Sequence, residues 1–366
     1  MKKGLICSAL SLFLVLALAA CGTPAAQQST DTSVQPAQSE NNQATTVESQ
    51  SPSERTFNIK LAGIKTDDDP ASIAMNLFAE EVNKNSGGTI TVKTYTNSTL
   101  GPINDLLSGM TNNTVDMLYN TFSCYSWLEG AKRFTAITAP FLWNDNQELQ
   151  AFLDSDTAHK WMEEAAASSG VRTLIAKGEL PPRQLTANRA IKNADDFKGL
   201  KIRTAEAPIV QETMKRLGAT PVVVPFADLY LALKQGTVDA QENNFITAKT
   251  SSLFEVQSHF MKTDYIRDVS AIFISEKIWT EMSDSQKKVM SDAAEKAVAR
   301  EAELVAAQLT ETMDFLKTKM TYVEIDVPSI QAKLGSDIYT EFDKAGQLWP
   351  TGTMDEILKF KAAYKK

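Results

Sequence analysis

The sequence predicts an α/β fold of two lobes that close on each other like a clamshell. Three observations support this prediction. Short apolar strands alternate with helical segments in two successive units, a further strand returns the chain to the first unit, and a helical segment of more than 30 residues follows. Alternating strands and helices favour a mostly parallel sheet covered by helices. The returning strand predicts two lobes rather than one large sheet.

The first unit alternates three strands with two helices. Its opening strand alternates polar and apolar residues, and the helix after it has apolar side chains at helical spacing. The pair Gly87-Gly88 turns the chain into the next strand. We expect strands at 56–62, 89–95 and 115–119, with helices at 70–85 and 103–110.

The second unit has the same alternation. It begins with a strand near Val171 and continues through the apolar strands 198–204 and 221–226. A helix at 227–236 follows, because its apolar residues again have helical spacing. This unit predicts a second sheet.

A returning strand and a long helix define how the lobes are joined. The apolar strand 268–275 leads back to the first lobe, and Ser283 with Gln286 forms a capping box for the next helix. That helix continues to about Lys319 without glycine or proline, about 50 Å at 1.5 Å per residue. A coiled coil is less favoured, because no heptad is sustained. We assign 55–180 with 269–308 to the first lobe, and 181–268 with 309–366 to the second.

The N-terminus has the features of a bacterial lipoprotein signal. Lys2 and Lys3 precede an apolar run that is too short to span a bilayer, and the run ends in L-A-A-C at Cys21. We expect a signal peptide at 1–20 and a lipid on Cys21; the alternative is an ordinary secretory signal that happens to precede a cysteine. Residues 21–54 are polar and predict a disordered linker. The protein is then extracytoplasmic and attached to the membrane only through its lipid, on a Gram-positive-type envelope or on the periplasmic side.

Charge and cysteine content restrict the partners. The formal charge of −8 becomes −10 without Lys2 and Lys3, which argues against nucleic acid or an anionic membrane surface as a partner. The cysteines are Cys7, Cys21 and Cys124. The globular body therefore has no intramolecular disulfide, and Cys124 is expected to be a buried apolar residue.

Enzymatic function is not expected. The two histidines, His159 and His259, stand in no metal-binding or nucleophile-activating arrangement. The sequence also has no Walker loop, no G-x-S-x-G and no C-x-x-C. No cofactor or metal ligand is predicted.

Two arginines in the second unit indicate an anion pocket. Arg203 lies near the end of an apolar strand, and Arg183 opens the segment R-Q-L-T-A-N-R. A guanidinium is costly to desolvate unless an anion meets it, and its planar fork binds a carboxylate through two parallel hydrogen bonds. The alternative is that each arginine pairs with a structural Asp or Glu.

At these residues the chain resembles the substrate-binding proteins of tripartite ATP-independent periplasmic (TRAP) transporters. The motifs are G-L-K-I-R ending at Arg203 and V-D-A-Q-E-N ending at Asn243. The resemblance implies that Arg203 clamps the ligand carboxylate, that Asn243 assists it, and that Arg183 and Phe226 complete the pocket. It extends roughly from residue 55 to the C-terminus. Further segments that fit are 100–110, 115–118, 139–143 and 282–289.

The first lobe is expected to supply Asn120 and Thr121, and specificity is also expected near Tyr265. The sequence departs from the family's pattern in places. Ala240 and Asn244 replace a glycine and a proline, and Thr121 stands where sialate-binding members have an acidic contact. Sialate is therefore not the expected ligand.

The resemblance implies a receptor of the two-lobed, class II periplasmic-binding-protein type, with a long helix spanning both lobes. It would capture a mono- or dicarboxylate and deliver it to TRAP membrane subunits driven by an ion gradient, so that it needs no nucleotide or other cofactor. Two alternatives remain: a lipoprotein solute-binding protein of an ABC importer, and a ligand-sensing surface receptor. Which acid binds, and whether a metal ion accompanies it, stay open.

Overall fold

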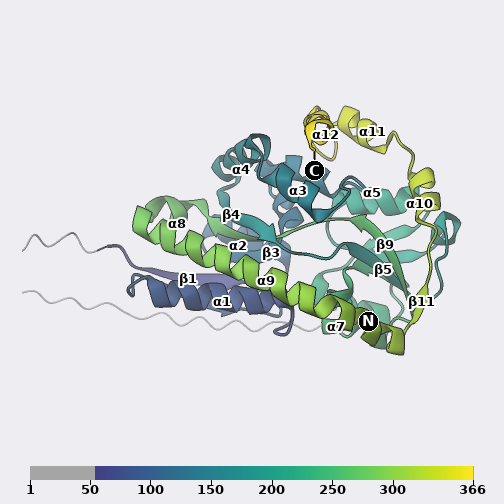
Figure 1. The fold of residues 1–366 in the computed structure, drawn as a ribbon, viewed down its shortest axis with the longest axis horizontal. Coiled ribbons are helices and arrows are strands. Elements are labelled where there is room, and N and C mark those ends of the chain that lie inside the picture. Colours follow the sequence, from purple (N-terminus) through teal and green to yellow (C-terminus); the bar gives the residue numbers. More distant parts are fainter. Residues whose placement is uncertain (1–53, 366) are drawn as a thin grey trace, which may run out of the picture. The chain divides into compact units, whose positions relative to one another are not determined.

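The computed structural model describes residues 54–365 (Figure 1). The predicted signal peptide at 1–20, the lipidation site Cys21 and nearly all of the predicted linker at 21–54 lie outside the described residues. Within them, the strands form two sheets. No helix of residues 54–365 combines the length and apolar character needed to cross a membrane.

The first sheet has the strand order β2-β1-β3-β10-β4. Helices α1 and α2 alternate with its first strands, as predicted, and α1 has the expected limits, because Asp69 caps its first turn and Pro70 opens it. Every residue of β10 is buried. The bounds are β1 (Phe57–Ala62), α1 (Pro70–Asn85), β2 (Ile90–Tyr95), α2 (Ile103–Asn112), β3 (Met117–Thr121), α3 (Asn146–Leu153), α4 (Asp156–Ser169), β4 (Val171–Gly178), β10 (Ser270–Ser275) and α8 (Glu276–Glu281).

The second sheet has the order β11-β9-β5-β8-β6-β7. The predicted strand 221–226 ends early at Val223, because Phe226 already begins a 3₁₀ turn that leads into α6. The bounds are β5 (Arg183–Ala187), β6 (Lys201–Thr204), α5 (Pro208–Arg216), β7 (Thr220–Val223), α6 (Leu229–Lys234), β8 (Ala240–Asn243), α7 (Phe245–Thr250), β9 (His259–Ile266), β11 (Thr321–Val323) and α10 (Val327–Leu334).

Each sheet contains one reversed strand among the described residues. In the first sheet β10 is antiparallel to β3 and β4, and in the second β5 is antiparallel to β8 and β9. Both reversed strands directly follow a short link between the sheets, 179–182 before β5 and 267–269 before β10. The expected mostly parallel order therefore holds for every described strand except β5 and β10.

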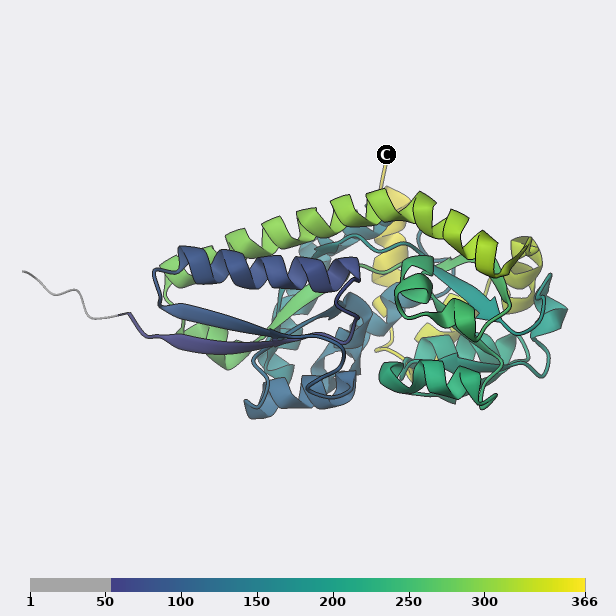
Figure 2. The same cartoon turned by 90° about the horizontal axis from the view of Figure 1, so that it is seen from below.

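The long helix α9 (Asp284–Lys319) begins with the predicted capping box of Ser283 and Gln286. It packs against α1 and β4 near its start and against α7 near its end (Figure 2). Alanines such as Ala297 let it approach α1 closely, and Leu316 packs with Phe260 of the second sheet. The helix thus spans both sheets, as the sequence predicted.

The C-terminal segment, which the sequence analysis assigned to the second lobe, includes a helix that contacts the first-lobe range. Helix α11 (Ile338–Ala345) is followed by α12 (Thr353–Ala363), which packs against α3 of the first-lobe range. The rings of Phe360 and Phe152 lie 5.3 Å apart in an edge-to-face arrangement. Burial of this apolar face draws the end of the chain back across the body. The lobe boundaries stay a prediction.

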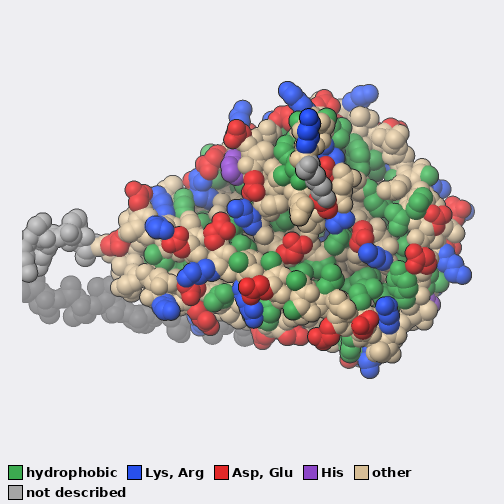
Figure 3. All heavy atoms as spheres, viewed as in Figure 1, with side chains coloured by type: hydrophobic (Ala, Val, Ile, Leu, Met, Phe, Trp, Pro, Cys, Tyr) green, Lys and Arg blue, Asp and Glu red, His purple; other side chains and the backbone are tan. Residues whose placement is uncertain are grey.

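Surface charge is mixed on the face shown in Figure 3, where Lys and Arg alternate with Asp and Glu. His159 is exposed on α4. Cys124 is buried, as predicted.

Candidate ligand-binding cleft

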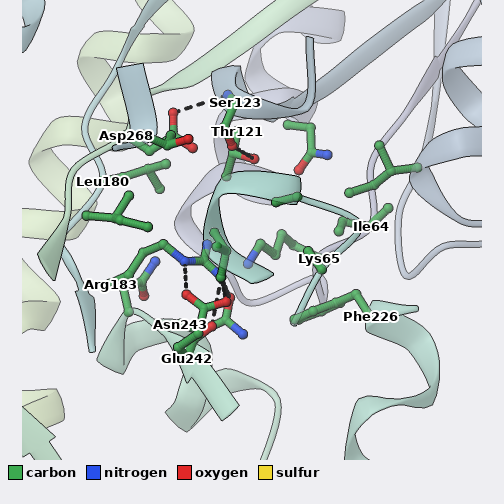
Figure 4. A pocket seen from close by; sticks show the side chains of 18 of the residues that line it. Ile64, Lys65, Thr121, Ser123, Leu180, Arg183, Phe226, Glu242, Asn243 and Asp268 are labelled. Atoms are coloured by element: carbon green, nitrogen blue, oxygen red, sulfur yellow. Dashed lines mark hydrogen bonds and ion pairs between the residues drawn. The ribbon is translucent and has the colours of Figure 1, made fainter. Parts of the chain in front are cut away.

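A cavity opens where the carboxyl ends of strands from both sheets meet (Figure 4). It encloses about 810 Å³, its open mouth included. Parallel strands direct their carboxyl ends to one edge, which is where α/β proteins bind ligands. Two groups of lining residues matter here. The anchor wall, from the second sheet, consists of Arg183, Arg203, Phe226, Glu242 and Asn243; the opposite wall consists of Lys65, Asn120, Thr121, Ser123 and Asp268.

Arg203 is a buried cation that forms no ion pair with a carboxylate of the described residues. Its side chain is 2% exposed, and Nε donates to the carbonyl oxygen of Val224 at 2.9 Å. Among residues 54–365, its terminal nitrogens make no hydrogen bond or ion pair with the protein. Burial lowers the pKa of Arg203 to about 10, so the side chain stays cationic at neutral pH. A buried guanidinium with free donors facing a cavity is suited to hold an anion.

Arg183 differs, because Glu242 occupies its fork. Nε donates to Glu242, and Nη2 donates to Glu242 Oε1 at 2.8 Å and to the Glu242 carbonyl oxygen at 2.7 Å. Burial alone would lower the pKa of Arg183, but the Glu242 carboxylate outweighs it and raises that pKa. Pairing with a structural acid, left open by the sequence, therefore holds for Arg183 and not for Arg203. The cleft does not contain two uncompensated guanidiniums.

Asn243 and Phe226 flank the arginines. The Asn243 amide nitrogen donates to Gln241 Oε1 at 2.7 Å, and its oxygen accepts from Arg183 Nη2 at 3.3 Å. These bonds fix the amide at the carboxyl end of β8. Phe226, which follows β7, presents its ring to the cavity (Figure 4).

Tyr265 does not line the cavity, although the sequence placed it near the ligand. It is 5% exposed, and its hydroxyl donates to Glu242 Oε2 at 2.6 Å. Burial and the Glu242 charge raise its pKa well above the usual range. Tyr265 therefore supports the carboxylate that pairs with Arg183.

The opposite wall contains two buried polar atoms that bond no other atom of residues 54–365. Asp268 lies on the link before β10, and its Oδ1 accepts from the backbone nitrogens of Ser123 at 3.2 Å and Val269 at 2.9 Å. Within the described part of the chain, its Oδ2 has no hydrogen-bond partner, and neither has Asn120 Nδ2. Burial raises the pKa of Asp268 to about 6. The predicted Thr121 lies beside them and accepts from Ser123 Oγ at 3.3 Å (Figure 4).

Lys65 reaches across the cleft from the end of β1. Its Nζ donates to Thr247 Oγ1 of α7 at 2.9 Å and lies 4.7 Å from the centre of the Phe226 ring. Burial lowers the pKa of Lys65, the buried Asp69 raises it, and the charges of the two cleft arginines lower it further.

Sequence reasoning missed Lys65, Glu242 and Asp268. Lys65 stands three residues after the predicted strand 56–62, which was a usable signal for a residue at the cleft edge. Glu242 stands inside the motif that supplied Asn243, but only strand pairing shows that it meets Arg183. No group of three or more His, Cys, Asp or Glu in residues 54–365 is arranged to hold a metal ion.

Comparison with known proteins found relatives that match most of the described residues. Residues 61–335 match the model of a family described as bacterial extracellular solute-binding protein, family 7. The sialic acid-binding periplasmic protein of Vibrio cholerae is 29% identical over 271 residues, 73% of this chain and 82% of that protein. The C4-dicarboxylate-binding periplasmic protein of Rhodobacter capsulatus is 26% identical over 256 residues, 68% of this chain and 76% of that protein.

A solved structure is similar over most of the body. It is a TRAP periplasmic solute-binding protein from Roseobacter denitrificans with bound L-galactonate, at a TM-score of 0.72 and 25% identity, covering 80% of this chain and 99% of that one. This likeness confirms the predicted two-lobed α/β fold.

Proposed function

The chain belongs to family 7 of the bacterial extracellular solute-binding proteins, and from this premise we propose that its cleft captures a small organic acid for the membrane subunits of a TRAP transporter. The single observation that supports an acidic ligand is the buried guanidinium of Arg203. It is buried at the carboxyl end of a strand, its donors face the cavity, and no carboxylate of residues 54–365 forms an ion pair with it. A ligand carboxylate would supply that missing partner through two charge-assisted hydrogen bonds.

The other predicted residues have supporting roles around the proposed bond between Arg203 and the ligand carboxylate. Asn243 holds its amide beside the carboxylate, Phe226 packs against the carbon chain, and Arg183 keeps Glu242 neutralised while it forms part of the wall. Asn120 and Thr121 meet the ligand from the first lobe. Tyr265 acts through Glu242 and not on the ligand.

Closure of the two lobes completes the site. Lys65 bonds Thr247, and Asn104 bonds Glu206 beside the cavity mouth, so both pairs link the first-lobe range to the second. Expulsion of water strengthens each charge-assisted bond, because the local dielectric constant falls. The closed receptor is then the form that docks on the membrane subunits.

In this proposal the protein binds its ligand and does not catalyse a reaction on it. Transport is driven by an ion gradient in the membrane subunits. The protein is extracytoplasmic and is held through a lipid on Cys21, which the L-A-A-C motif supports. Fractionation of a Cys21→Ser variant tests the anchor, and recovery of that variant in the membrane fraction would count against it.

Matched acids and amides test the ligand class. We expect small carboxylic acids to raise the melting temperature of the body, and their amides to leave it unchanged, because only the acid can neutralise Arg203. Calorimetric titration of the same pairs gives the affinities. Amides that bind as tightly as the acids would show that the carboxylate is not recognised.

A further inference from the structure

A chain of side-chain hydrogen bonds runs from Asn243 into the interior of the second sheet. The Asn243 amide nitrogen donates to Gln241 Oε1 at 2.7 Å, and Gln241 Nε2 donates to Thr186 Oγ1 at 2.8 Å. Thr186 Oγ1 in turn donates to Gln257 Oε1 at 3.1 Å. All four residues are 4% exposed or less, and of the four only Asn243 lines the cavity. Together they form the buried amide chain.

Strand geometry brings the buried amide chain together. Gln241 and Asn243 are two residues apart on β8, so their side chains leave the same face of the sheet. Thr186 of β5 is the register partner of Gln241 in the antiparallel pair. The chain of bonds therefore crosses from one strand to the next on one face.

The far end of the buried amide chain fixes its direction. Gln257 Nε2 lies 3.3 Å from the carbonyl oxygen of Asp239 and 3.2 Å from that of Val256, and it donates to Asn188 Oδ1 at 2.8 Å. Backbone carbonyls cannot turn, so a reversed Gln257 amide would set its oxygen against two fixed oxygen atoms. The nitrogen of Gln257 therefore points to these carbonyls, and its oxygen points to Thr186.

Each side chain closer to the cavity then has one permitted orientation. Thr186 has a single hydrogen, which goes to Gln257, so its oxygen accepts from Gln241. The oxygen of Gln241 consequently faces Asn243, and the Asn243 amide presents its nitrogen there. One hydrogen of Asn243 Nδ2 is left, and no residue of 54–365 accepts it. It stays available to a ligand oxygen.

Arg183 restrains the Asn243 amide less strongly than the buried amide chain does. Arg183 Nη2 has two hydrogens, and it donates to Glu242 Oε1 at 2.8 Å and to the Glu242 carbonyl oxygen at 2.7 Å (Figure 4). The contact from Nη2 to Asn243 Oδ1 is longer, at 3.3 Å, and competes for the same hydrogens. The orientation of the amide therefore depends mainly on the side of Gln241.

We propose that Gln241, Thr186 and Gln257 are positioning residues of the cleft, which keep an Asn243 donor available to the ligand carboxylate without lining the cavity themselves. With the amide reversed, its oxygen would face a carboxylate oxygen, and two acceptors cannot bond each other. The inference rests on the proposed function, because it needs an acid in the cleft. It assigns part of the binding strength to side chains inside the sheet.

Thr186→Val tests the buried amide chain at its middle. Valine keeps the shape and removes the hydroxyl, so Gln241 loses its acceptor and is free to turn its nitrogen toward Asn243. We expect the affinity for an acid to fall about 10-fold, the size of one hydrogen bond to a charged group. Thr186→Ser retains the hydroxyl and should restore the affinity.

A matched control changes a threonine elsewhere. Thr353 of α12 is as buried as Thr186, and its hydroxyl donates to the Pro350 carbonyl oxygen at 2.6 Å. Thr353→Val therefore loses a hydroxyl bond of the same kind away from the cleft, and it should leave the affinity unchanged. An equal loss of affinity in Thr353→Val and Thr186→Val would contradict the positioning role.

A double-mutant cycle separates positioning from a general loss of stability. In an Asn243→Ala background the buried amide chain has no amide to hold, so Thr186→Val should change the affinity less than about twofold. A loss of the same size in both backgrounds would overturn the inference. Should Thr186→Val melt too low to titrate, Gln257→Met breaks the same bond from its other side and enters the same cycle.

Two readouts keep this inference distinct from the proposed function. Affinities come from calorimetric titration with the acid that raises the melting temperature most among acetate, lactate, succinate, malate, gluconate and glucuronate. The second readout needs no ligand: it is the side-chain amide resonance of Asn243 in protein with isotope-labelled asparagine, identified by its loss in Asn243→Ala. This resonance should shift in Thr186→Val and not in Thr353→Val.

The outcomes are then separable. An unshifted Asn243 resonance in folded Thr186→Val would overturn the inference while the proposed function stands. Absence of binding by every acid would contradict the proposed function, and the Asn243 resonance would still decide whether the buried amide chain sets the orientation of the amide.

Discussion

The two walls of the cleft differ in how completely their polar groups are bonded. On the anchor wall, Arg183, Glu242 and Asn243 form one network that Tyr265 supports from behind. On the opposite wall, Asp268 and Asn120 each keep a buried atom that has no hydrogen-bond partner among residues 54–365. The bonded network fixes the positions of Arg183 and Asn243, whereas unbonded groups can still take a partner from outside the protein. The anchor network is therefore complete before a ligand arrives, and the opposite wall is not.

Removal of Glu242 is expected to damage the anchor wall most. In Glu242→Ala, Arg183 becomes a buried cation without its partner, which costs about 3–5 kcal/mol of folding stability. Urea unfolding of the ligand-free protein measures this cost. The double variant Glu242→Ala/Arg183→Met should regain part of the lost stability, because it also removes the unpaired cation. If it regains none, the loss in Glu242→Ala does not come from the broken Arg183–Glu242 ion pair.

Arg203→Ala comes next and should act on binding rather than on folding. We expect a loss of ~3 kcal/mol or more in affinity for the acid, because the ligand carboxylate would lose its charge-assisted partner. Calorimetric titration measures the loss, with Arg300→Ala on the surface of α9 as the control. An intact fold with unchanged affinity would remove Arg203 from the site.

A buried carboxyl group of α9, that of Glu301, contacts the first sheet, and its protonation should make the folding stability depend on pH. Glu301 of α9 accepts from Tyr119 of β3 at 2.9 Å and from Ser270 of β10 at 2.7 Å, and burial raises its pKa from 4.5 to about 8. The folded state therefore holds a proton that the unfolded state releases. This stabilisation is complete below pH 4.5 and is lost as the pH rises through about 8.

Unfolding free energies at pH 5 and pH 9 test this pH dependence. The wild type should lose about 4 kcal/mol more than Glu301→Gln between these values, since glutamine does not titrate. Equal losses in the two proteins would show that Glu301 has an ordinary pKa.

Tyr265→Phe should have the smallest effect. It removes one hydrogen bond to Glu242 and leaves the bonds from Arg183, so we expect a loss of about 1 kcal/mol in stability and little change in affinity. A large loss of affinity with a normal melting temperature would instead place Tyr265 against the ligand.

Local sequence patterns predicted the frame of the molecule well. Helix α1 and the capping box of α9 depend on residues within a few positions of one another, and both agree with the structure. Arg203 could also be identified locally, because a cation in a short apolar strand is conspicuous. These features need no knowledge of strand pairing.

Long-range contacts could not be predicted in the same way. Glu242 meets Arg183 from 59 residues away, and that meeting depends on the register in which β5 pairs with β8. Lys65 reaches Thr247 across 182 residues and across the cleft. Helix α12 returns to α3 because of an apolar face whose partner the sequence does not name.

Asp268 lies on the link that leads into the reversed strand β10, and this place affects how far Asp268 moves when the lobes close. The link 267–269 is one of two short segments by which the chain passes between the strands of the two sheets, so we expect it to lie close to the pivot of lobe movement. A side chain near a pivot sweeps a short arc, while one far from it, such as Lys65 on the β1–α1 loop, sweeps a long one. Asp268 can then meet an incoming ligand before the lobes come together, and the Lys65 contacts form afterwards. Discrimination between ligands would thus precede commitment, and a rejected acid could leave without the lobes having closed.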